Sequence, residues 1–426
     1  MFNSFTFACG QGATKALIHC VETGVISYNN CCIVNSTIKD VPSKYEDKAI
    51  IISDDPDAGC GKVRGAARSL MVRYLKNNPN VIDSMLEETD YVNIITTTEG
   101  ASGSGASVVL AHFIKNDLGI PVIITVITGF EADIRGIQNT IEYFKDLDGG
   151  DFVINTISNK KFLDSYGNTF AAEKAANEYI ANTINMINEN KIINSEQNID
   201  DTDHYKIITN PGLLFCNEST FEKIKNKSQF DQIVSDLVDY SKSLDFSPSA
   251  TKIGIYMNIS DSNLDNVDTN FTSIKKKLCE NDCVPELFIH KQYDKNEKEF
   301  VRVIASGINL PKEEVEAMYN KFRNSIEKCS CEDNFFSFIS NMDTSSNTDS
   351  SSNKTSNSFL NQFEDTAGNE EEEVVLGRNR RSRRKHSTMS NNNNSSDNGA
   401  TEEKKVSKFT TSNKKVPYSE DSIDNY

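Results

Sequence analysis

An abrupt change from apolar to glycine-rich sequence constrains the fold of this chain more than any other feature. Residues 91–98 are mostly β-branched or apolar with little alternation, which predicts a strand buried on both faces of a sheet. Residues 100–105 then read G-A-S-G-S-G, and an apolar helical pattern begins at Val108. This order suits a bound anion, because glycine permits close backbone approach and a helix N-terminus presents free N–H groups. A phosphate cradle and a flexible glycine/serine turn both fit this stretch when it is taken alone.

Length and charge narrow the class of protein. At 426 residues the chain is long enough for two domains with substantial cores. Its formal net charge of -17 argues against non-specific nucleic-acid binding by the whole surface. No early apolar run reaches the length of a membrane span, and the N-terminus lacks the basic-then-apolar pattern of a secretory signal. We therefore expect a cytoplasmic protein with no membrane partner.

The ten cysteines are interpreted as reduced residues with structural roles. Cys31 and Cys32 lie in an apolar strand pattern, where cysteine packs as a small hydrophobic residue. Two short spacings, C-x3-C and C-x-C, lack paired histidines and give only a weak zinc signal; the pairs are Cys279/Cys283 and Cys329/Cys331. We therefore expect no metal site built from cysteine.

A second strand–glycine–helix pattern opens the chain. Residues 5–9 form a short apolar strand pattern, a helix is expected from Lys15, and the turn between them contains Gly10, Gln11, Gly12 and Ala13. A dinucleotide-binding fingerprint would need a third glycine at Lys15 and an acid closing the next strand, residues 31–34. That strand ends instead in Asn35, so the sequence disfavours a nicotinamide-dependent dehydrogenase.

A third strand, residues 49–53, leads into the loop D-D-P-D-A-G-C-G-K. The loop is not a P-loop, because Pro56 replaces the first glycine and Val63 replaces the hydroxyl residue that binds Mg²⁺. Its last residues include Gly59, Gly61 and Lys62, and a helix is expected over residues 63–75.

Strands and helices alternate every thirty-odd residues through the first half of the chain. Further strands are expected over residues 122–128 and 152–158, and a long helix with an apolar stripe is expected over residues 169–190. This alternation predicts a doubly wound α/β fold with a parallel sheet. Ligands in such folds bind beyond the carboxyl ends of the strands, where all the glycine-rich turns fall.

An acidic motif, N-x-D-x-x-D, follows the long helix at Asn198, Asp200 and Asp203. Two carboxylates three residues apart at the start of a helix can point the same way and orient a water molecule. The alternative is an acidic helix start, in which Asp200 or Asp203 only caps the helix.

The second half reads as an α+β domain followed by a polar tail. Strands are expected over residues 206–216, 252–259, 286–292 and 300–308, with helices over 221–244 and from Pro311 to Glu327. From about residue 341 the chain is too polar to bury a core, which predicts disorder. The tail contains an acidic run, Glu370–Glu373, and a basic run of Arg378, Arg380, Arg381, Arg383, Arg384 and Lys385. That basic run fits either a solvated linker or an electrostatic hook for DNA, an acidic adaptor or neighbouring filaments.

Five loops, in order, resemble those of the tubulin/FtsZ superfamily, and most of all those of its TubZ group from plasmids and phages. Residues 100–105 resemble its signature G-G-T-G-[ST]-G, with Ala101 and Ser102 at the second glycine and the threonine. G-Q-G-A-T resembles the first glycine loop of the family, and A-G-C-G-K-x-R resembles its loop over the γ-phosphate. F-E-A-D-I-R resembles F-E-x-x-x-R, and the N-x-D-x-x-D motif resembles the synergy loop. The resemblance covers about residues 5–327.

The resemblance implies an architecture of four parts. They are a Rossmann-like GTP-binding domain (1–167), a central helix with the catalytic synergy loop (168–205), an α+β activation domain (206–330) and a disordered tail (341–426).

The resemblance also implies a GTP site with Mg²⁺ as a cofactor. Its nucleotide-binding residues would be Gly10, Gln11, Gly12, Ala13, Asn35, Gly59, Gly61, Lys62, Gly100, Ala101, Ser102, Gly103, Ser104, Glu131, Arg135, Asn159, Asn177 and Glu178. Among these, Glu131 would hold the ribose hydroxyls, Arg135 would reach the nucleotide, and the last three would read the guanine. Taken alone, Glu131 and Arg135 also fit an exposed i,i+4 helix pair.

The family polymerises head to tail, so Asn198, Asp200 and Asp203 would complete GTP hydrolysis on the nucleotide of the next subunit. The chain is therefore expected to be a GTPase that forms dynamic filaments for plasmid or phage DNA segregation, with a DNA-bound adaptor held by the tail. Two alternatives stay open: a filament scaffold that does not hydrolyse GTP, and a monomeric Rossmann-type enzyme that uses another nucleotide.

Overall fold

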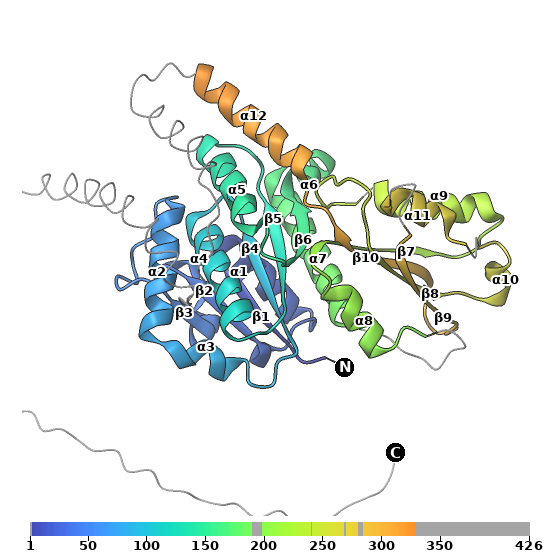
Figure 1. Ribbon diagram of the computed structural model, residues 1–426, viewed down its shortest axis with the longest axis horizontal. Coiled ribbons are helices and arrows are strands. Elements are labelled where there is room, and N and C mark those ends of the chain that lie inside the picture. The colour runs from blue at the N-terminus through green and yellow to red at the C-terminus, as the bar shows by residue number, and fades with distance from the viewer. Residues whose placement is uncertain (1, 190–197, 240, 268–269, 280–283, 329–426) are drawn as a thin grey trace, which may run out of the picture. The chain divides into compact units, whose positions relative to one another are not determined.

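The computed structural model describes residues 2–189, 198–239, 241–267, 270–279 and 284–328, all of which belong to one compact unit. Its strands are β1 (Ser4–Cys9), β2 (Cys31–Asn35), β3 (Ala49–Ile51), β4 (Tyr91–Thr97), β5 (Val122–Thr128), β6 (Val153–Ser158), β7 (Gly212–Phe221), β8 (Lys252–Asn258), β9 (Glu286–Gln292) and β10 (Glu299–Ile308). Figure 1 shows their arrangement.

The helices fall between these strands. They are α1 (Gln11–Glu22), α2 (Arg64–Asn77), α3 (Pro79–Met85), α4 (Ala101–His112), α5 (Ile134–Leu147), α6 (Asn159–Tyr166), α7 (Thr169–Asn188), α8 (Asp201–Ile208), α9 (Lys227–Asp239), α10 (Asp261–Leu264), α11 (Thr272–Leu278) and α12 (Lys312–Lys328). Short 3-10 segments occur at η1 (Tyr28–Asn30), η2 (Ile38–Asp40) and η3 (Ser43–Lys48), and η4 (Phe113–Asp117) is a π-helical extension of α4.

The described strands form one mixed sheet in the order β3-β2-β1-β4-β5-β6-β7-β10-β8-β9. Strands β1 to β6 pair in parallel, whereas β10 pairs antiparallel with both β7 and β8. The two parts of the sheet meet at β6 and β7, which pair in parallel at Val153–Gly212 and Ile154–Leu213. The parallel part confirms the predicted doubly wound α/β fold, and its carboxyl ends all open toward the same edge.

Helices cover both faces of the sheet, because its strands alternate their apolar side chains between two cores. Phe5, Phe7 and Cys9 of β1 pack with α2, α4 and α5, whereas Ala8 packs with α1, α6 and α7 on the opposite face. A third cluster joins the end of α7 and α8 to β7, β8 and β10. Figure 1 places α6 at one end of α7 and α8 at the other.

Side-chain caps explain where several of these helices begin. The caps, each accepting a backbone N–H from the first turn, are Asp133 for α5, Ser158 for α6, Asn168 for α7 and Asp200 for α8. Helix α6 ends at Gly167, whose φ of 73° is the left-handed conformation that glycine adopts readily.

Several predicted boundaries were wrong. The turns expected before Lys15 and over residues 100–105 are short, because α1 begins at Gln11 and α4 begins at Ala101. Lys206 was expected in a strand but lies in α8, because Asp200 caps a helix there and β7 begins only at Gly212. The helix expected over residues 221–244 is shorter, since β7 runs to Phe221 and α9 spans Lys227–Asp239.

Cys31 and Cys32 are core residues, each 2% exposed, as expected. Cys279 is buried and unoxidised, whereas Cys283, Cys329 and Cys331 lie outside the described residues, as does the tail expected over 341–426. Over the described ranges, no helix is long and apolar enough to cross a membrane, and no group of three or more His, Cys, Asp or Glu is placed to hold a metal ion.

Candidate nucleotide-binding site

Predicted site residues from five loops meet at the carboxyl edge of the parallel strands. Gly10 follows β1, Asn35 ends β2, Gly100 lies between β4 and α4, Glu131 follows β5, and Asn159 follows β6. Because these strands are adjacent or nearly so in the order β2-β1-β4-β5-β6, the five loops share one edge of the sheet.

The first glycine loop and the glycine-rich signature are in backbone contact. Gly10 has a φ of 82°, and a Cβ on it would lie 2.8 Å from the backbone nitrogen of Gly103. A Cβ on Gly103 would lie 2.7 Å from the carbonyl oxygen of Cys9. These positions need glycine because backbone atoms cannot move aside as a flexible side chain can. The contact holds the N-termini of α1 and α4 side by side.

Both of these helices begin without a side-chain cap. Gly10 and Gly100 are the N-cap residues of α1 and α4, and neither has a side chain that could accept a first-turn N–H. The paired helix ends therefore present two sets of backbone donors, with the positive ends of both helix dipoles, to the same region. Such a pair of helix ends can bind the oxygens of a polyphosphate.

The signature residues themselves are unequal in exposure. Ala101 is only 5% exposed, so its methyl group adds little surface at the place where the resembled signature has glycine. Ser104 is fully buried, and its hydroxyl donates to the Gly100 carbonyl oxygen at 2.5 Å. Ser102 is less buried, and its Oγ lies 2.7 Å from Oγ of Ser36. Ser102 is thus the signature side chain best placed to meet a ligand.

Cys60 and Ser36 join Ser102 in a polar cluster that the sequence did not indicate. Hydrogen bonds from Ser36 and Ser102 stabilise the Cys60 thiolate in part, but burial is the larger effect and raises the pKa of the Cys60 thiol. Asn35 accepts the backbone N–H of Ser36 through Oδ1 at 2.8 Å, and its Nδ2 is buried without a hydrogen-bond partner in the described structure. The cluster links the end of β2 to the start of α4.

The loop between β3 and α2 is held by hydrogen bonds near both of its ends. Near its start, the Pro56 carbonyl oxygen accepts hydrogen bonds from Thr37 Oγ1 and the Ile38 N–H, each at 2.9 Å. At its end, the Lys62 carbonyl oxygen accepts from Arg135 Nε at 3.2 Å and from Asn139 Nδ2 at 3.3 Å.

The glycines of that loop have open space around them, and two residues of the loop have a positive φ. Gly61 and Lys62 have φ values of 58° and 65°, and Cβ atoms on Gly59 or Gly61 would meet nothing within 4 Å. Lys62 Nζ lies 2.7 Å from Asp133 Oδ2, and this hydrogen bond is the main reason that the pKa of Asp133 is lowered. The glycines are therefore accessible, and a lysine stands beside them.

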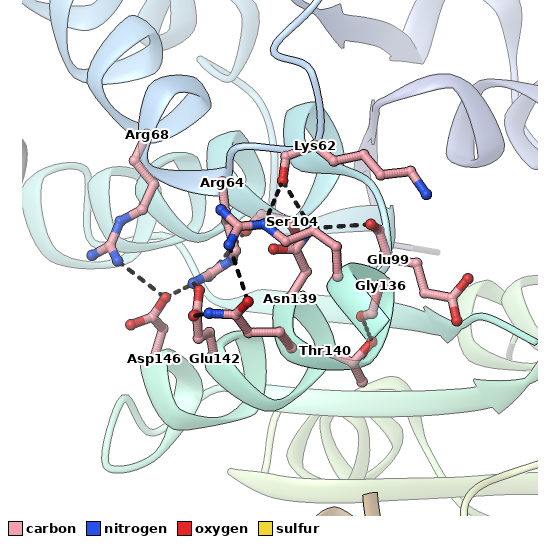
Figure 2. Close-up of polar contacts among 12 residues, drawn as sticks. Lys62, Arg64, Arg68, Glu99, Ser104, Gly136, Asn139, Thr140, Glu142 and Asp146 are labelled. Atoms are coloured by element: carbon pink, nitrogen blue, oxygen red, sulfur yellow. Dashed lines mark hydrogen bonds and ion pairs between the residues drawn. The ribbon is translucent and has the colours of Figure 1, made fainter. Parts of the chain in front are cut away.

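An ion-pair network around the buried Arg64 connects the helices that follow these loops (Figure 2). Arg64, at the start of α2, donates to the Ser104 carbonyl oxygen at 3.2 Å and to Asp146 Oδ2. Arg68 also contacts Asp146, at 3.3 Å, and Glu142 lies 3.9 Å from Arg64. The network connects α2, α4 and α5, so it fixes the β3–α2 and β4–α4 loops relative to each other.

Glu99 and Glu131 lie together at the ends of β4 and β5. The Glu99 carboxylate occupies space that a Cβ on Gly129 would need, and its Oε1 accepts the Glu131 N–H at 2.8 Å. Burial raises the pKa of Glu99. Glu131 lies ahead of α5, so Glu131 and Arg135 do not form the i,i+4 helix pair that was the alternative interpretation. Instead, Glu131 forms ion pairs with Lys160 and Lys321.

The acidic motif lies away from this edge of the sheet. Helix α7 has 20 residues, a length of about 30 Å, and separates α6 from α8. Asn198 and Asp200 are exposed, and Asp200 Oδ1 accepts the Asp203 N–H at 2.8 Å as the cap of α8. Asp203 Oδ1 also lies 3.2 Å from Lys206 Nζ. Asp200 therefore caps α8, and the cap uses only one oxygen of its carboxylate, Oδ1.

This arrangement matches solved structures over most of the described chain. TubZ of the Clostridium botulinum phage c-st superposes with a TM-score of 0.61 at 19% identity, covering 77% of this chain and 100% of that one. CetZ2 from Haloferax volcanii, in a protofilament bound to GTPγS, gives 0.63 at 16% identity, with coverages of 77% and 99%. An FtsZ dimer from M. jannaschii gives 0.56 at 18% identity, with coverages of 73% and 93%.

The chain has the tubulin/FtsZ fold. The similarity is one of structure, since no protein-family model and no curated protein sequence matches the chain. The recognition of this fold from the five loop motifs is thereby confirmed.

The tubulin/FtsZ fold brings most of the predicted nucleotide-binding residues to one edge, while three predicted guanine-reading residues are more scattered. Asn159 follows β6 directly and is the first residue of α6. Asn177 is half-buried and Glu178 exposed in the middle of α7, which packs against α6 and α1. A Lys15–Glu173 ion pair of 3.1 Å links α1 to α7 nearby.

Sequence reasoning missed the residues that hold the site together. Glu99, Ser36 and Cys60 each adjoin a predicted motif, so proximity in sequence was a usable signal for them. Lys321 is 190 positions from Glu131, so the sequence did not indicate that these two residues are in contact.

Proposed function

We propose that this protein binds and hydrolyses GTP and polymerises head to tail into filaments. The backbone contact between Gly10 and Gly103 is the observation that carries the proposal, because it sets two uncapped helix N-termini beside each other at the carboxyl edge of a parallel sheet. The residues proposed for the site are those that the resemblance implied, and most of them lie after the ends of β1 to β6.

Within this site the polar groups divide by position. The first turns of α1 and α4, with Ser102, would bind the phosphates, and Gly59, Gly61 and Lys62 would cover them. Glu131 would accept hydrogen bonds from the ribose hydroxyls, and Asn159, Asn177 and Glu178 would address the guanine edge. A carboxylate that accepts from guanine N1 and N2 favours guanine over adenine.

Mg²⁺ fits this site as a partner of the nucleotide phosphates. Magnesium usually keeps several waters and binds one or two protein groups plus phosphate oxygens, so it does not need a dedicated cluster of acids. When bound, it would neutralise phosphate charge during transfer to water. The Ser36–Ser102 hydroxyl pair and the Asn35 side chain are the polar groups beside the paired helix ends.

The acids of α8 are proposed to act on the neighbouring subunit. Asp200 and Asp203 lie at the end of α7 that is remote from the glycine loops, so they would meet nucleotide only where one copy stacks on the next. A head-to-tail contact of this kind uses two different surfaces and need not close, which makes filaments. The protofilament described for CetZ2 supports such assembly.

The decisive experiment separates the capping role of Asp200 from a catalytic one. Asparagine caps helices as well as aspartate does but carries no charge, so Asp200→Asn keeps the α8 cap. We expect Asp200→Asn and Asp203→Asn to bind GTP and to pellet with it, while hydrolysis falls by about 10²- to 10⁴-fold, the usual contribution of a general base. The measurements are GTP affinity, sedimentation and phosphate release across a range of protein concentrations.

The wild-type protein serves as the reference in the same assays. Its rate per subunit should rise steeply with concentration, because catalysis needs two copies. A rate independent of concentration would favour the monomeric enzyme, and sedimentation with GTP, ATP and NAD would identify its nucleotide. Filaments that form without any phosphate release would favour the scaffold.

We further propose that the filaments act in the cytoplasm to position plasmid or phage DNA. The support is the basic run of the tail, residues 378–385, in a chain with a net charge of -17. A DNA-bound adaptor protein is the proposed partner of the tail.

A further inference from the structure

Two lysines from distant parts of the chain converge on the carboxylate of Glu131. Lys321 Nζ, from α12, lies 2.6 Å from Glu131 Oε2, and Lys160 Nζ, from α6, lies 3.5 Å from the same oxygen. Lys321 Nζ also lies 3.4 Å from the Glu131 carbonyl oxygen. The Glu131 side chain is 13% exposed, whereas the two lysine side chains are about half exposed. The carboxylate is therefore the enclosed member of the cluster.

The backbone of Glu131 is held in a conformation that a glutamate rarely adopts. Its φ is 55°, in the left-handed region, which costs on the order of 1–3 kcal/mol for a non-glycine residue. Its N–H is held by Glu99 Oε1 at 2.8 Å and its carbonyl oxygen by Lys321. Contacts on both sides of the residue thus fix the direction in which its side chain leaves the β5–α5 loop.

Helix α12 is itself firmly placed, so the Lys321 ammonium has a defined position. Met318, Phe322 and Ile326 are buried in the core beside α5, and α12 packs along α5 (Figure 1). Near its start, Glu314 Oε2 accepts the Asp245 N–H at 2.5 Å. The last described helix therefore reaches back to the nucleotide edge of the sheet.

We propose that Lys321 is a positioning residue for Glu131, so that the sugar end of the nucleotide site is completed by α12. This inference rests on the proposed role of Glu131 in binding the ribose hydroxyls. Both lysines contact Oε2, which leaves Oε1 as the oxygen that would accept hydrogen bonds from the ribose hydroxyls. Without Lys321, the Glu131 side chain keeps only the longer Lys160 contact and samples other rotamers, which weakens its hydrogen bonds to the sugar.

The test is sugar dependence, because a purely structural role would not change it. We expect wild-type protein to bind GTP more tightly than 2′,3′-dideoxy-GTP by about tenfold or more, the value of hydrogen bonds to a charged group. Lys321→Ala and Glu131→Gln should each bring this ratio close to one, through weaker binding of GTP and not of the dideoxy analogue. Glu131→Gln combined with Lys321→Ala should add little to either change.

Two controls accompany these variants. Lys312→Ala removes the same side chain from the first turn of α12, and Lys321→Arg retains the charge, so both should keep the wild-type ratio. Partial unfolding lowers the apparent affinity for both nucleotides by the same factor. The ratio of the two affinities can therefore be compared even for a variant that is partly unfolded.

The outcomes separate the two proposals. If wild-type protein binds no GTP, the proposed function fails. If wild-type protein prefers GTP over the dideoxy analogue and Lys321→Ala keeps that preference, this inference alone is overturned. Equal losses for both nucleotides in Lys321→Ala would also overturn it, because they leave the ratio at its wild-type value.

Discussion

At the scale of single residues, the site depends on contacts that only particular side chains allow. Gly103 lies against the Cys9 carbonyl oxygen, and Gly10 lies against the Gly103 backbone. The sequence predicted glycine for close approach to a phosphate, whereas the structure shows that these two glycines are also needed for close approach to each other. These two glycines therefore have a structural role as well as the proposed ligand-binding one.

Gly103→Ala should destabilise the fold and weaken nucleotide binding together. The added methyl group meets backbone atoms at 2.7 Å and 3.1 Å, so the β1–α1 and β4–α4 segments must separate. We expect a loss of about 1–3 kcal/mol in the free energy of unfolding, the usual cost of overpacking. Urea denaturation measures it, with Gly59→Ala as the matched control, since a Cβ on Gly59 meets nothing within 4 Å. Equal stability of the two variants would contradict this explanation.

At the scale of elements, α8 is joined to its neighbours by a buried histidine as well as by the apolar packing of Ile207 and Ile208. His204 Nδ1 lies 2.6 Å from Tyr256 Oη on β8, and its Nε2 lies 2.8 Å from the Ile187 carbonyl oxygen near the end of α7. Burial lowers the pKa of His204, with the positive charge of Arg302 acting in the same direction. The helix that begins with Asp201 and contains Asp203 is thus held in place by a neutral imidazole.

The stability of the protein should therefore fall in mild acid. In the unfolded chain His204 takes up a proton near pH 6.5, whereas in the folded state its pKa is lower. The contribution of His204 to the free energy of unfolding is therefore full above about pH 6.5. It is lost as the pH falls from there through the lowered pKa of the folded state. Chemical denaturation at pH 7.5 and 5.5 should show a smaller free energy of unfolding at the lower pH. His204→Gln should reduce this difference. The part that remains includes the effect of His112, because burial lowers the pKa of that residue as well. A pH dependence unchanged by His204→Gln would refute the assignment.

Elements also show how far the sequence could predict this fold. Strands β5 and β9 have the predicted bounds; β5 is a β-branched run throughout, whereas β9 has an apolar centre, L-F-I, between polar ends. The start of α4 was placed too late, since glycine and serine are poor helix formers and only tertiary contacts keep residues 101–105 helical. Lys206 was misassigned because two isoleucines, Ile207 and Ile208, fit a strand pattern as well as one face of α8.

At the scale of the whole molecule, one continuous sheet joins the edge that carries the proposed nucleotide site to the second half of the chain. The four glycine-rich and F-E-x-x-x-R motifs were enough to predict the first half, because each follows the end of a strand. The contacts between the halves were not predictable, since pairs such as Glu131–Lys321 and Glu314–Asp245 join residues that are far apart in the sequence. The assembly and the tail belong to this scale as well.

The tail should be needed for cargo and dispensable for catalysis. We expect that deleting residues 341–426 abolishes capture of an adaptor–DNA complex in co-sedimentation with filaments, while GTP hydrolysis is retained, because the proposed catalytic residues lie before residue 204. Replacing only the six basic residues with glutamine should reproduce the loss, and the wild-type interaction should weaken as salt rises. Cargo capture by the shortened chain would disprove a role for the tail.

The reach of α12 back to Glu131 has a consequence for how the protein is made. A ribosome releases the glycine loops first and Lys321 only after nearly all of the described chain has been synthesised. Until then Glu131 lacks its shorter ion pair, so the sugar end of the proposed site is completed only late in synthesis.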